Sequence, residues 1–295
     1  MYIGPDVLQS WLLMMDILGG LVARREGIPW VLSERTSGPM YTGGQVYSAP
    51  RRYWLRGRLA RRAAAVISNS SGGDEYWQTR LPARVRRYVI PNSVPFEEID
   101  SAPEQPAGLG KTVPGQKIIL HVGRFSWEKN LDVLLPALRE VLRRVDARVV
   151  MCGDGYLFET YRRKLAEWGL LDRFLLLGNI SSEQIYSWMK RADVMVSGSL
   201  FEGCPNAILE ATVCGCPLVV SDIAAYRDLL DDRSAVLADV GSEEAFASAV
   251  LDVLKHPEQA RLRAETAVEV SSKLTLDRIV RQYDRVYRDL LEAKS

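Results

Sequence analysis

The chain has 295 residues, of which 47% are hydrophobic and 25% are charged, and its formal net charge at pH 7 is +1. A chain of this length and apolar content can bury a large core and normally divides into two domains. The near-neutral charge argues against a general nucleic-acid binder, which needs an excess of basic residues.

In the first part of the chain, apolar runs alternate with amphipathic stretches, which predicts strands joined by crossover helices. We expect strands over residues 6–11, 30–34, 65–69 and 88–90, and helices over residues 13–26 and 51–62. The apolar stretch 7–23 also resembles a signal or membrane segment, but Asp16 interrupts it. A central Asp costs about 2.5–3.5 kcal/mol on membrane insertion, so a strand followed by a helix fits better and export is not expected.

Residues 51–62 form a basic amphipathic stretch in which arginines alternate with aromatic and apolar residues. An anionic membrane surface is one expected partner, because basic residues near such a surface contribute about 1 kcal/mol each and aromatic residues insert beside them. A solvated helix face with aromatic residues in the core is an equally open alternative. The arginines expected to contact a membrane are Arg51, Arg52, Arg56 and Arg58.

A proline- and glycine-rich segment separates this part from the next. It contains Pro91, Pro95, Pro103, Pro106, Gly108, Gly110, Pro114 and Gly115. Neither a helix nor a strand can occupy it throughout. Strands are then expected over residues 117–122, 148–152, 174–177, 194–197 and 218–221, and a final amphipathic helix over residues 276–293. The expected parts of the chain are therefore residues 1–105, 106–275 and 276–295.

Residues 200–211 change from loop chemistry to helix chemistry. The turn before Asn206 predicts a helix that begins near this residue, with backbone N–H groups and a positive dipole end that attract phosphate. Glu202 precedes that helix and Glu210 lies within it, so the two do not share one exposed helical stripe. Their carboxylates can accept hydrogen bonds from a polyol and from a vicinal diol such as ribose. A nucleotide-sugar would satisfy all three features.

This segment resembles the donor-binding motif of the retaining glycosyltransferases of family four, which have the GT-B fold. The resemblance extends to Gly123 and Arg124 with Lys129, which look like the family's loop for the donor diphosphate. Gly153 belongs to a second glycine-rich turn, and the loop at 177–180 resembles the family's base-contacting loop. Residues 214–222 resemble its closing strand. The donor-binding residues implied are Gly123, Arg124, Lys129, Gly153, Asn179, Ile180, Glu202, Gly203, Cys204, Pro205, Asn206, Ala207 and Glu210.

The resemblance implies an α/β chain of two Rossmann-like domains with parallel sheets, with the C-terminal helix packed back on the first domain. The strand at 6–11 resembles one from the middle of the family's N-terminal domain, so we expect that domain to be incomplete. Met14 stands where many relatives carry a histidine near the sugar.

The implied reaction is transfer of a sugar from a UDP-sugar or GDP-sugar to a polysaccharide or glycolipid acceptor, with retention of configuration. Glu202, Arg124 and Lys129 are the expected catalytic residues, with Glu202 on the sugar hydroxyls and Glu210 on the ribose. No Asp-x-Asp occurs, so we expect no metal and no cofactor. The cysteines lack Cys-x-x-Cys spacing, which favours reduced thiols in a cytoplasmic protein. The basic stretch 51–62 adds the expectation of a peripheral position on the inner face of the membrane.

Two alternatives stay open at this point. The chain can be a nucleotide-sugar-binding fragment or inactive relative that needs a partner for its missing strands. It can also be a GT-B epimerase, although no histidine lies where an acid–base pair at the sugar would need one.

Overall fold

The structure is a computed structural model that describes residues 4–36, 50–106 and 115–292. The chain divides into two compact units. The first comprises residues 1–93, 202–204 and 276–295, and the second comprises residues 94–201 and 205–275. Of the expected linker, Gly108, Gly110 and Pro114 lie outside the described residues, as does Ala293 at the end of the expected last helix.

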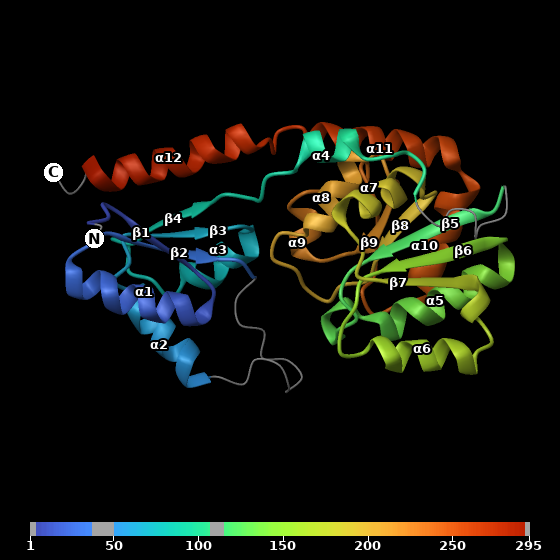
Figure 1. Cartoon of the computed structure of the whole chain (residues 1–295), viewed down its shortest axis with the longest axis horizontal. Helices are drawn as coiled ribbons and strands as arrows, with labels where there is room; N and C mark the ends of the chain where they lie inside the picture. Colours follow the sequence, from blue (N-terminus) through green and yellow to red (C-terminus); the bar gives the residue numbers. More distant parts are fainter. Residues whose placement is uncertain (1–3, 37–49, 107–114, 293–295) are drawn as a thin grey trace. The chain divides into compact units, whose positions relative to one another are not determined.

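The first unit contains a parallel sheet with strand order β1-β2-β3-β4 (Figure 1). The strands are β1 (Leu8–Trp11), β2 (Trp30–Glu34), β3 (Ala65–Ser68) and β4 (Arg86–Val89). The helices between them are α1 (Leu13–Glu26), α2 (Pro50–Ala60) and α3 (Ser71–Gln78). Because sequential parallel strands are joined by right-handed crossovers, these helices cover one face of the sheet.

The bounds predicted for α1 and β2 agree with the structure, whereas α3 is not predicted from the sequence. The segment Ser70–Asp74 has the composition of a turn. Here the Ser70 hydroxyl instead accepts a hydrogen bond from the Gly73 N–H and caps the helix. No helix of the described residues is long and apolar enough to span a bilayer, and the stretch 7–23 forms β1 and part of α1.

The other face of the first sheet carries α12 (Leu276–Glu292). Successive residues of a strand point to opposite faces. Ser10 contacts α1 through Asp16, whereas Gln9 accepts a hydrogen bond from the Tyr287 hydroxyl of α12. The Arg86 guanidinium also donates to the Asp289 carbonyl at 3.1 Å. Helices therefore cover both faces of this sheet, as parallel sheets require.

A network of buried charges lies between α1, α2 and the end of β2. The Arg56 guanidinium contacts Asp16 Oδ2 and Glu34 Oε2, each at 2.7 Å. Arg56 is only 4% exposed, and Trp77 Nε1 also donates to Glu34 Oε2 at 3.1 Å. Burial raises the pKa of Asp16 even though the neighbouring guanidinium lowers it.

The expectation that Arg56 contacts a membrane surface is therefore wrong. The basic stretch is amphipathic, but Arg56 lies on its buried face, because two carboxylates there neutralise the guanidinium. Arg51, Arg52 and Arg58 are exposed.

The second unit is built on a parallel six-stranded sheet with strand order β10-β9-β8-β5-β6-β7. Its strands are β5 (Lys117–Val122), β6 (Ala147–Cys152), β7 (Phe174–Gly178), β8 (Val194–Ser197), β9 (Leu218–Ser221) and β10 (Val236–Ala238). The sequence predicts the first five and misses the three-residue β10.

The helices of this unit lie on two faces of the sheet. One face carries α5 (Leu131–Arg144), α6 (Phe158–Glu167) and α10 (Glu243–Lys255). The other carries α7 (Ser182–Arg191) and α8 (Asn206–Val213), onto which α4 (Phe96–Ser101) and α11 (Pro257–Ser271) pack. The short helix α9 (Ala224–Arg227) and 3-10 turns at Trp127–Lys129 and Leu171–Arg173 complete the unit.

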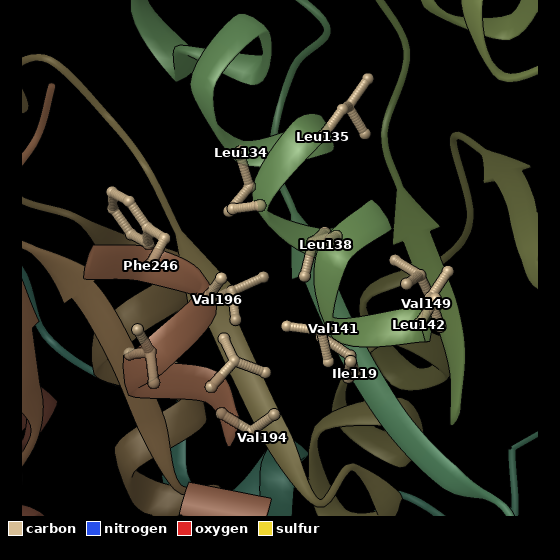
Figure 2. Packing of buried hydrophobic residues seen from close by; sticks show 14 of the residues in the cluster. Ile119, Leu134, Leu135, Leu138, Val141, Leu142, Val149, Val194, Val196 and Phe246 are labelled. Carbon is tan, nitrogen blue, oxygen red and sulfur yellow. The ribbon is translucent and has the colours of Figure 1, made fainter. Parts of the chain in front are cut away.

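The main core lies between α5, α10 and the central strands, as Figure 2 shows. Leucines three and four residues apart on α5 give one apolar stripe, and Leu134, Leu138 and Val141 are fully buried. They meet Ile119 of β5 and Val194 of β8, which are also fully buried. This core fixes the ends of β5 and β8 relative to each other.

The helix α4 lies within the expected linker. Val94 N donates to the Leu274 carbonyl at 2.9 Å, and Lys190 Nζ donates to the Ala102 carbonyl at 2.7 Å. Residues 94–102 thus belong to the second unit.

Candidate functional site

The strand order of the second unit reverses between β5 and β8. The chain proceeds from β5 outward to β6 and β7, then returns to β8 on the other side of β5. In open parallel sheets, ligands bind beyond the carboxyl ends of the strands at such a reversal. The residues that follow β5 here are Gly123 and Arg124, and the residues that follow β8 lead to α8.

Backbone hydrogen bonds join the loops that follow β5, β6, β7 and β8. Gly123 N donates to the Cys152 carbonyl at 3.0 Å, and Phe125 N donates to the Asp154 carbonyl at 3.0 Å. Gly153 N donates to the Gly178 carbonyl at 2.7 Å, and Leu200 N donates to the Glu128 carbonyl at 2.9 Å. These four loops are therefore held together at one edge of the sheet.

Gly153 allows two of these loops to approach closely. A Cβ atom at this position would lie 2.0 Å from the Gly123 carbonyl oxygen, and the φ angle of Gly153 is +132°. No L-residue fits either condition without moving the backbone. The glycine-rich turn after β6 thus supports the loop that carries Arg124.

Arg124 and Lys129 lie on the loop and 3-10 turn after β5. The Arg124 side chain is 73% exposed, with its guanidinium 3.6 Å from Glu128. The Glu128 side chain is 17% exposed, but the contact is long and the guanidinium is solvated, so an anionic ligand can compete with Glu128 for Arg124. The Lys129 stem lies over Gly123, with Cδ and Cε each 3.5 Å from the position of a Cβ there.

His121, on β5 beneath this loop, is fully buried. Its Nδ1 lies 3.1 Å from the Val196 carbonyl, whereas Nε2 has no hydrogen-bond partner. The pKa of His121 is lowered to about 4, mainly by burial and in smaller part by the nearby Lys129 charge, against the opposing effect of the hydrogen bond to Val196. The imidazole is therefore neutral at physiological pH.

The helix α8 begins at Asn206, where the sequence predicts a start. Pro205 occupies the N-cap and no side chain caps the helix. The carbonyl of Pro205 accepts from Ile208 N at 3.0 Å and from Leu209 N at 3.1 Å. Asn206 and Ala207 form the first turn, where the helix dipole adds positive potential.

Glu210 lies one turn into α8 and is partly buried. Burial raises the pKa of Glu210 to about 7, and the Glu98 carboxylate contributes in the same direction. Glu98 comes from α4, which packs on α8. Glu210 is therefore a carboxyl group whose charge changes near neutral pH.

The other predicted residues occupy distinct positions. Asn179 is exposed and Ile180 is half-buried in the loop after β7. Glu202, Gly203 and Cys204 precede α8 in the chain but are grouped with the first unit. The second unit brings together Gly123, Arg124, Lys129 and Gly153 at the loops after β5 and β6.

The sequence interpretation misses two residues near these groups. In the sequence, His121 stands within an apolar strand and looks like another core residue. The feature that could have indicated a functional role is its polar side chain, two positions before the Gly123–Arg124 turn. Glu98 falls in the expected linker. Its signal is the acidic pair Glu97–Glu98 after Pro95, which is typical of the first turn of a helix.

Comparison with known proteins identifies similar chains. A sequence profile of the family described as Glycosyl transferases group 1 matches residues 110–269, more than half of the chain. Alpha-D-kanosaminyltransferase of Streptomyces kanamyceticus is 28% identical over 80% of this chain and 63% of the relative. GDP-mannose:cellobiosyl-diphosphopolyprenol alpha-mannosyltransferase of Xanthomonas oryzae pv. oryzae is 30% identical over 78% of this chain and 59% of the relative.

Solved structures show the same architecture. Sucrose-phosphate synthase from Thermosynechococcus elongatus aligns with a TM-score of 0.85 and 19% identity, covering 98% of this chain and 75% of its own. Anabaena HepE in complex with UDP aligns with a TM-score of 0.82 and 18% identity, covering 96% of this chain and 79% of its own. This chain spans less than two thirds of the length of the curated relatives.

Proposed function

Because the chain belongs to the group 1 glycosyltransferases and has a GT-B-like fold, we propose that it binds a nucleotide-diphosphate sugar and transfers the sugar to a glycan or lipid-linked acceptor. The observation that carries the proposal is the position of Arg124 and Lys129 beyond the carboxyl end of β5, where the strand order reverses. The start of α8 follows β8, the neighbouring strand.

The proposed chemistry follows from the charge of the reacting groups. Breaking the anomeric bond places negative charge on the leaving diphosphate, and catalysis requires groups that bind this charge more strongly in the transition state. Arg124 suits bidentate contact with phosphate oxygens, and Lys129 supplies a compact positive charge. The α8 N-terminus adds backbone donors. We propose that these groups act without a metal ion.

Retention of configuration is part of the proposal, with a donor phosphate oxygen helping to deprotonate the acceptor. Glu202 would orient the sugar hydroxyls, and Glu210 would accept hydrogen bonds from the ribose diol. Activity that disappears with a chelator and returns with manganese would overturn metal independence. Inversion at the anomeric carbon, read from the product by NMR, would overturn retention.

Both uridine and guanosine donors fit the proposal. HepE has been solved in complex with UDP and UDP-glucose, and the Xanthomonas relative is named for GDP-mannose. We therefore test both donors.

The deciding experiment is calorimetric titration with UDP-glucose and GDP-mannose of the wild type and of Arg124→Ala and Glu210→Ala. Each removed contact to a charged group should weaken binding at least about tenfold. Arg143→Ala on α5 is the matched control, because this exposed arginine pairs with Glu140 on its own helix, away from the donor-side loops. Absence of binding to either donor, with the protein folded, would contradict the proposal.

The alternative function is that of a nucleotide-sugar-binding chain without transfer activity. It shares the donor site, so calorimetry does not separate the two. Donor consumption in the presence of a membrane extract that contains acceptors does: radiolabelled sugar incorporated into the glycolipid or polysaccharide fraction supports transfer. Binding without incorporation supports the alternative.

We also propose that the protein is cytoplasmic and contacts the inner membrane face through exposed arginines of the first unit. A groove of about 920 Å³ between α2 and α3 is lined by Arg58, Arg61, Arg62, Arg80 and Arg84, and none of the described residues that line it is a carboxylate. Arg58 lies 5.6 Å from the centre of the Trp54 ring, which is 64% exposed. Exposed aromatic and basic groups of this kind favour an anionic interface.

This contact is tested by sedimentation with vesicles that contain phosphatidylglycerol. The double charge reversal Arg52→Glu/Arg58→Glu should reduce the bound fraction several-fold, because each basic residue contributes about 1 kcal/mol near an anionic surface. Lys255→Glu/Lys273→Glu, on exposed positions of the second unit, makes the same charge change and should leave binding unaltered. Equal losses in both variants would contradict a specific role for the groove.

A further inference from the structure

We propose that His121 is a positioning residue for Lys129: when the donor binds, Nε2 of His121 accepts a hydrogen bond from the Lys129 ammonium and directs the remaining N–H donors toward the donor diphosphate. This inference rests on the proposed function, in which Lys129 binds that diphosphate. His121 itself does not touch the ligand.

The hydrogen bond at Nδ1 fixes the tautomer of the imidazole. Nδ1 lies 3.1 Å from the Val196 carbonyl, which can only accept, so Nδ1 carries the proton. In the neutral ring Nε2 is then a lone-pair acceptor. The side chain thus presents an acceptor to the space beneath the Gly123 loop.

This acceptor is buried and has no hydrogen-bond partner. A buried polar atom without a partner destabilises the folded state, and such atoms in folded proteins commonly have a functional reason. The rest of His121 is tightly fixed, because the residue is fully buried on β5. Its Nε2 is therefore held in place and does not need to be ordered when a donor approaches.

Gly123 brings Lys129 to this acceptor. A Cβ on Gly123 would lie 3.3 Å from His121 Nε2 and 3.5 Å from both Cδ and Cε of Lys129. The lysine stem and Nε2 therefore flank the same small space, and the ammonium is one bond beyond Cε. Any larger residue at position 123 would fill that space and separate the two side chains.

The His121 imidazole keeps the same charge over the working pH range. With a pKa of about 4, His121 stays neutral and does not repel the ammonium. A neutral acceptor in a buried position favours a charged donor, because hydrogen bonds to charged groups are stronger than those between neutral groups. Lys129 is thereby held over the diphosphate as a cation with a fixed direction.

Two conservative variants separate the two nitrogens of the imidazole. In His121→Asn the amide N–H stands near the position of Nδ1 and can keep the Val196 bond, but no acceptor remains near Nε2. In His121→Gln the amide oxygen reaches near the position of Nε2, and the Val196 bond is lost. If His121 has only a structural role, His121→Asn should retain more diphosphate affinity than His121→Gln. If His121 positions Lys129, His121→Gln should retain more.

The readout is affinity for nucleoside diphosphate compared with the monophosphate of the same base, measured by calorimetry on the full chain. We expect His121→Asn to weaken diphosphate binding about tenfold and monophosphate binding less than about twofold. His121→Gln should retain most of the diphosphate affinity. In a Lys129→Met background the Asn substitution should have no further effect, because the residue it positions is absent.

Several outcomes would overturn the inference. The inference is wrong if His121→Asn weakens monophosphate and diphosphate binding equally. It is also wrong if the Asn variant binds diphosphate more tightly than the Gln variant, or if the losses of affinity in His121→Asn and Lys129→Met add. Each of these results would show that His121 acts on folding alone. If an Asn variant fails to fold, the Gln variant and its cycle with Lys129→Met still decide the question. Wild type that binds no nucleotide would refute the proposed function itself, whereas wild-type binding that depends on Lys129 but not on His121 refutes only this inference.

Discussion

Arg56 forms buried ion pairs on which the stability of the first unit depends. Its guanidinium contacts two carboxylates at 2.7 Å, and all three groups are almost fully buried. Breaking such a pair from one side leaves uncompensated charge in the core, which is more costly than the net contribution of the intact pair. The composition of the stretch 51–62 does not reveal this, because the partners come from α1 and β2.

We therefore expect Arg56→Leu to lower the free energy of unfolding by about 3–5 kcal/mol, since Asp16 and Glu34 then remain buried beside each other. Arg58→Leu, two residues away on the exposed face, is the control and should change it by less than about 0.5 kcal/mol. Urea denaturation followed by tryptophan fluorescence measures both. An Arg56→Leu midpoint close to that of the wild type would contradict the network.

Titration of Glu210 should make donor affinity depend on pH. Its pKa is about 7 in the folded protein, because burial disfavours the carboxylate. Ribose hydroxyls that donate to the carboxylate favour the ionised form, so donor binding should lower this pKa and release a proton. Affinity should therefore fall as the pH drops from 8 to 6.

The measurement is calorimetry with a nucleotide-sugar in two buffers of different ionisation enthalpy, which reports the protons released. Wild type should release a proton near pH 6.5, and Glu210→Gln should release none and bind with an affinity that changes little between pH 6 and 8. The same proton release in the Gln variant would assign the titration to another group.

At the scale of elements, hydrophobic periodicity predicts the long strands and helices but not the short ones. The strand β5 is an apolar run between polar flanks, and the run gives its bounds. The three-residue β10 and the glycine-containing α3 have no such pattern, because pairing with β9 and the Ser70 cap define them. The helix α4 is not predicted because the sequence around it is rich in proline. Contacts with α7 and α8 stabilise it.

The donor-side loops could be located from the sequence because glycines mark them, but their hydrogen bonds could not. The sequence predicts a turn at Gly153, and the structure adds that this turn supports the Gly123 carbonyl. His121 and Glu98 were missed for the same physical reason: each lies beside a residue that is distant in the sequence, Val196 for His121 and Glu210 for Glu98.

Gly153→Ala tests the contact between the loops after β5 and β6. The added Cβ would lie 2.0 Å from the Gly123 carbonyl oxygen at a φ of +132°, so the backbone must move. Strain alone costs about 1–3 kcal/mol, and the displaced Arg124 should weaken donor binding several-fold. Gly169→Ala is the control, with a φ of +66° but no atom within 4 Å of its Cβ.

Thermal unfolding and donor titration of both variants give the comparison. Gly169→Ala should lose about 1 kcal/mol of stability and no donor affinity, because its cost is that of a left-handed backbone angle. Unchanged donor affinity in Gly153→Ala would contradict the support that this turn gives to the Arg124 loop.

At the scale of the whole molecule, charge is divided unevenly between two units that each have a parallel sheet of their own. Residues 1–93 contain thirteen arginines and six acidic residues, although the complete chain has a formal net charge of only +1. The net charge of the complete chain does not reveal this division. Its near-neutral value therefore describes the charge of neither unit. The two-domain α/β architecture, by contrast, follows from the alternation of strands and helices along the chain.

The cations of the groove between α2 and α3 are all arginines, and the chain has no lysine before Lys111. Amine-reactive dyes, crosslinkers and surface chemistries therefore leave the guanidinium groups of this groove unmodified. Apart from the N-terminal amine, such reagents attach to the chain only at residue 111 and beyond. A sensor chip that captures the protein through its lysines would preserve the charge of the groove for direct measurement of vesicle binding.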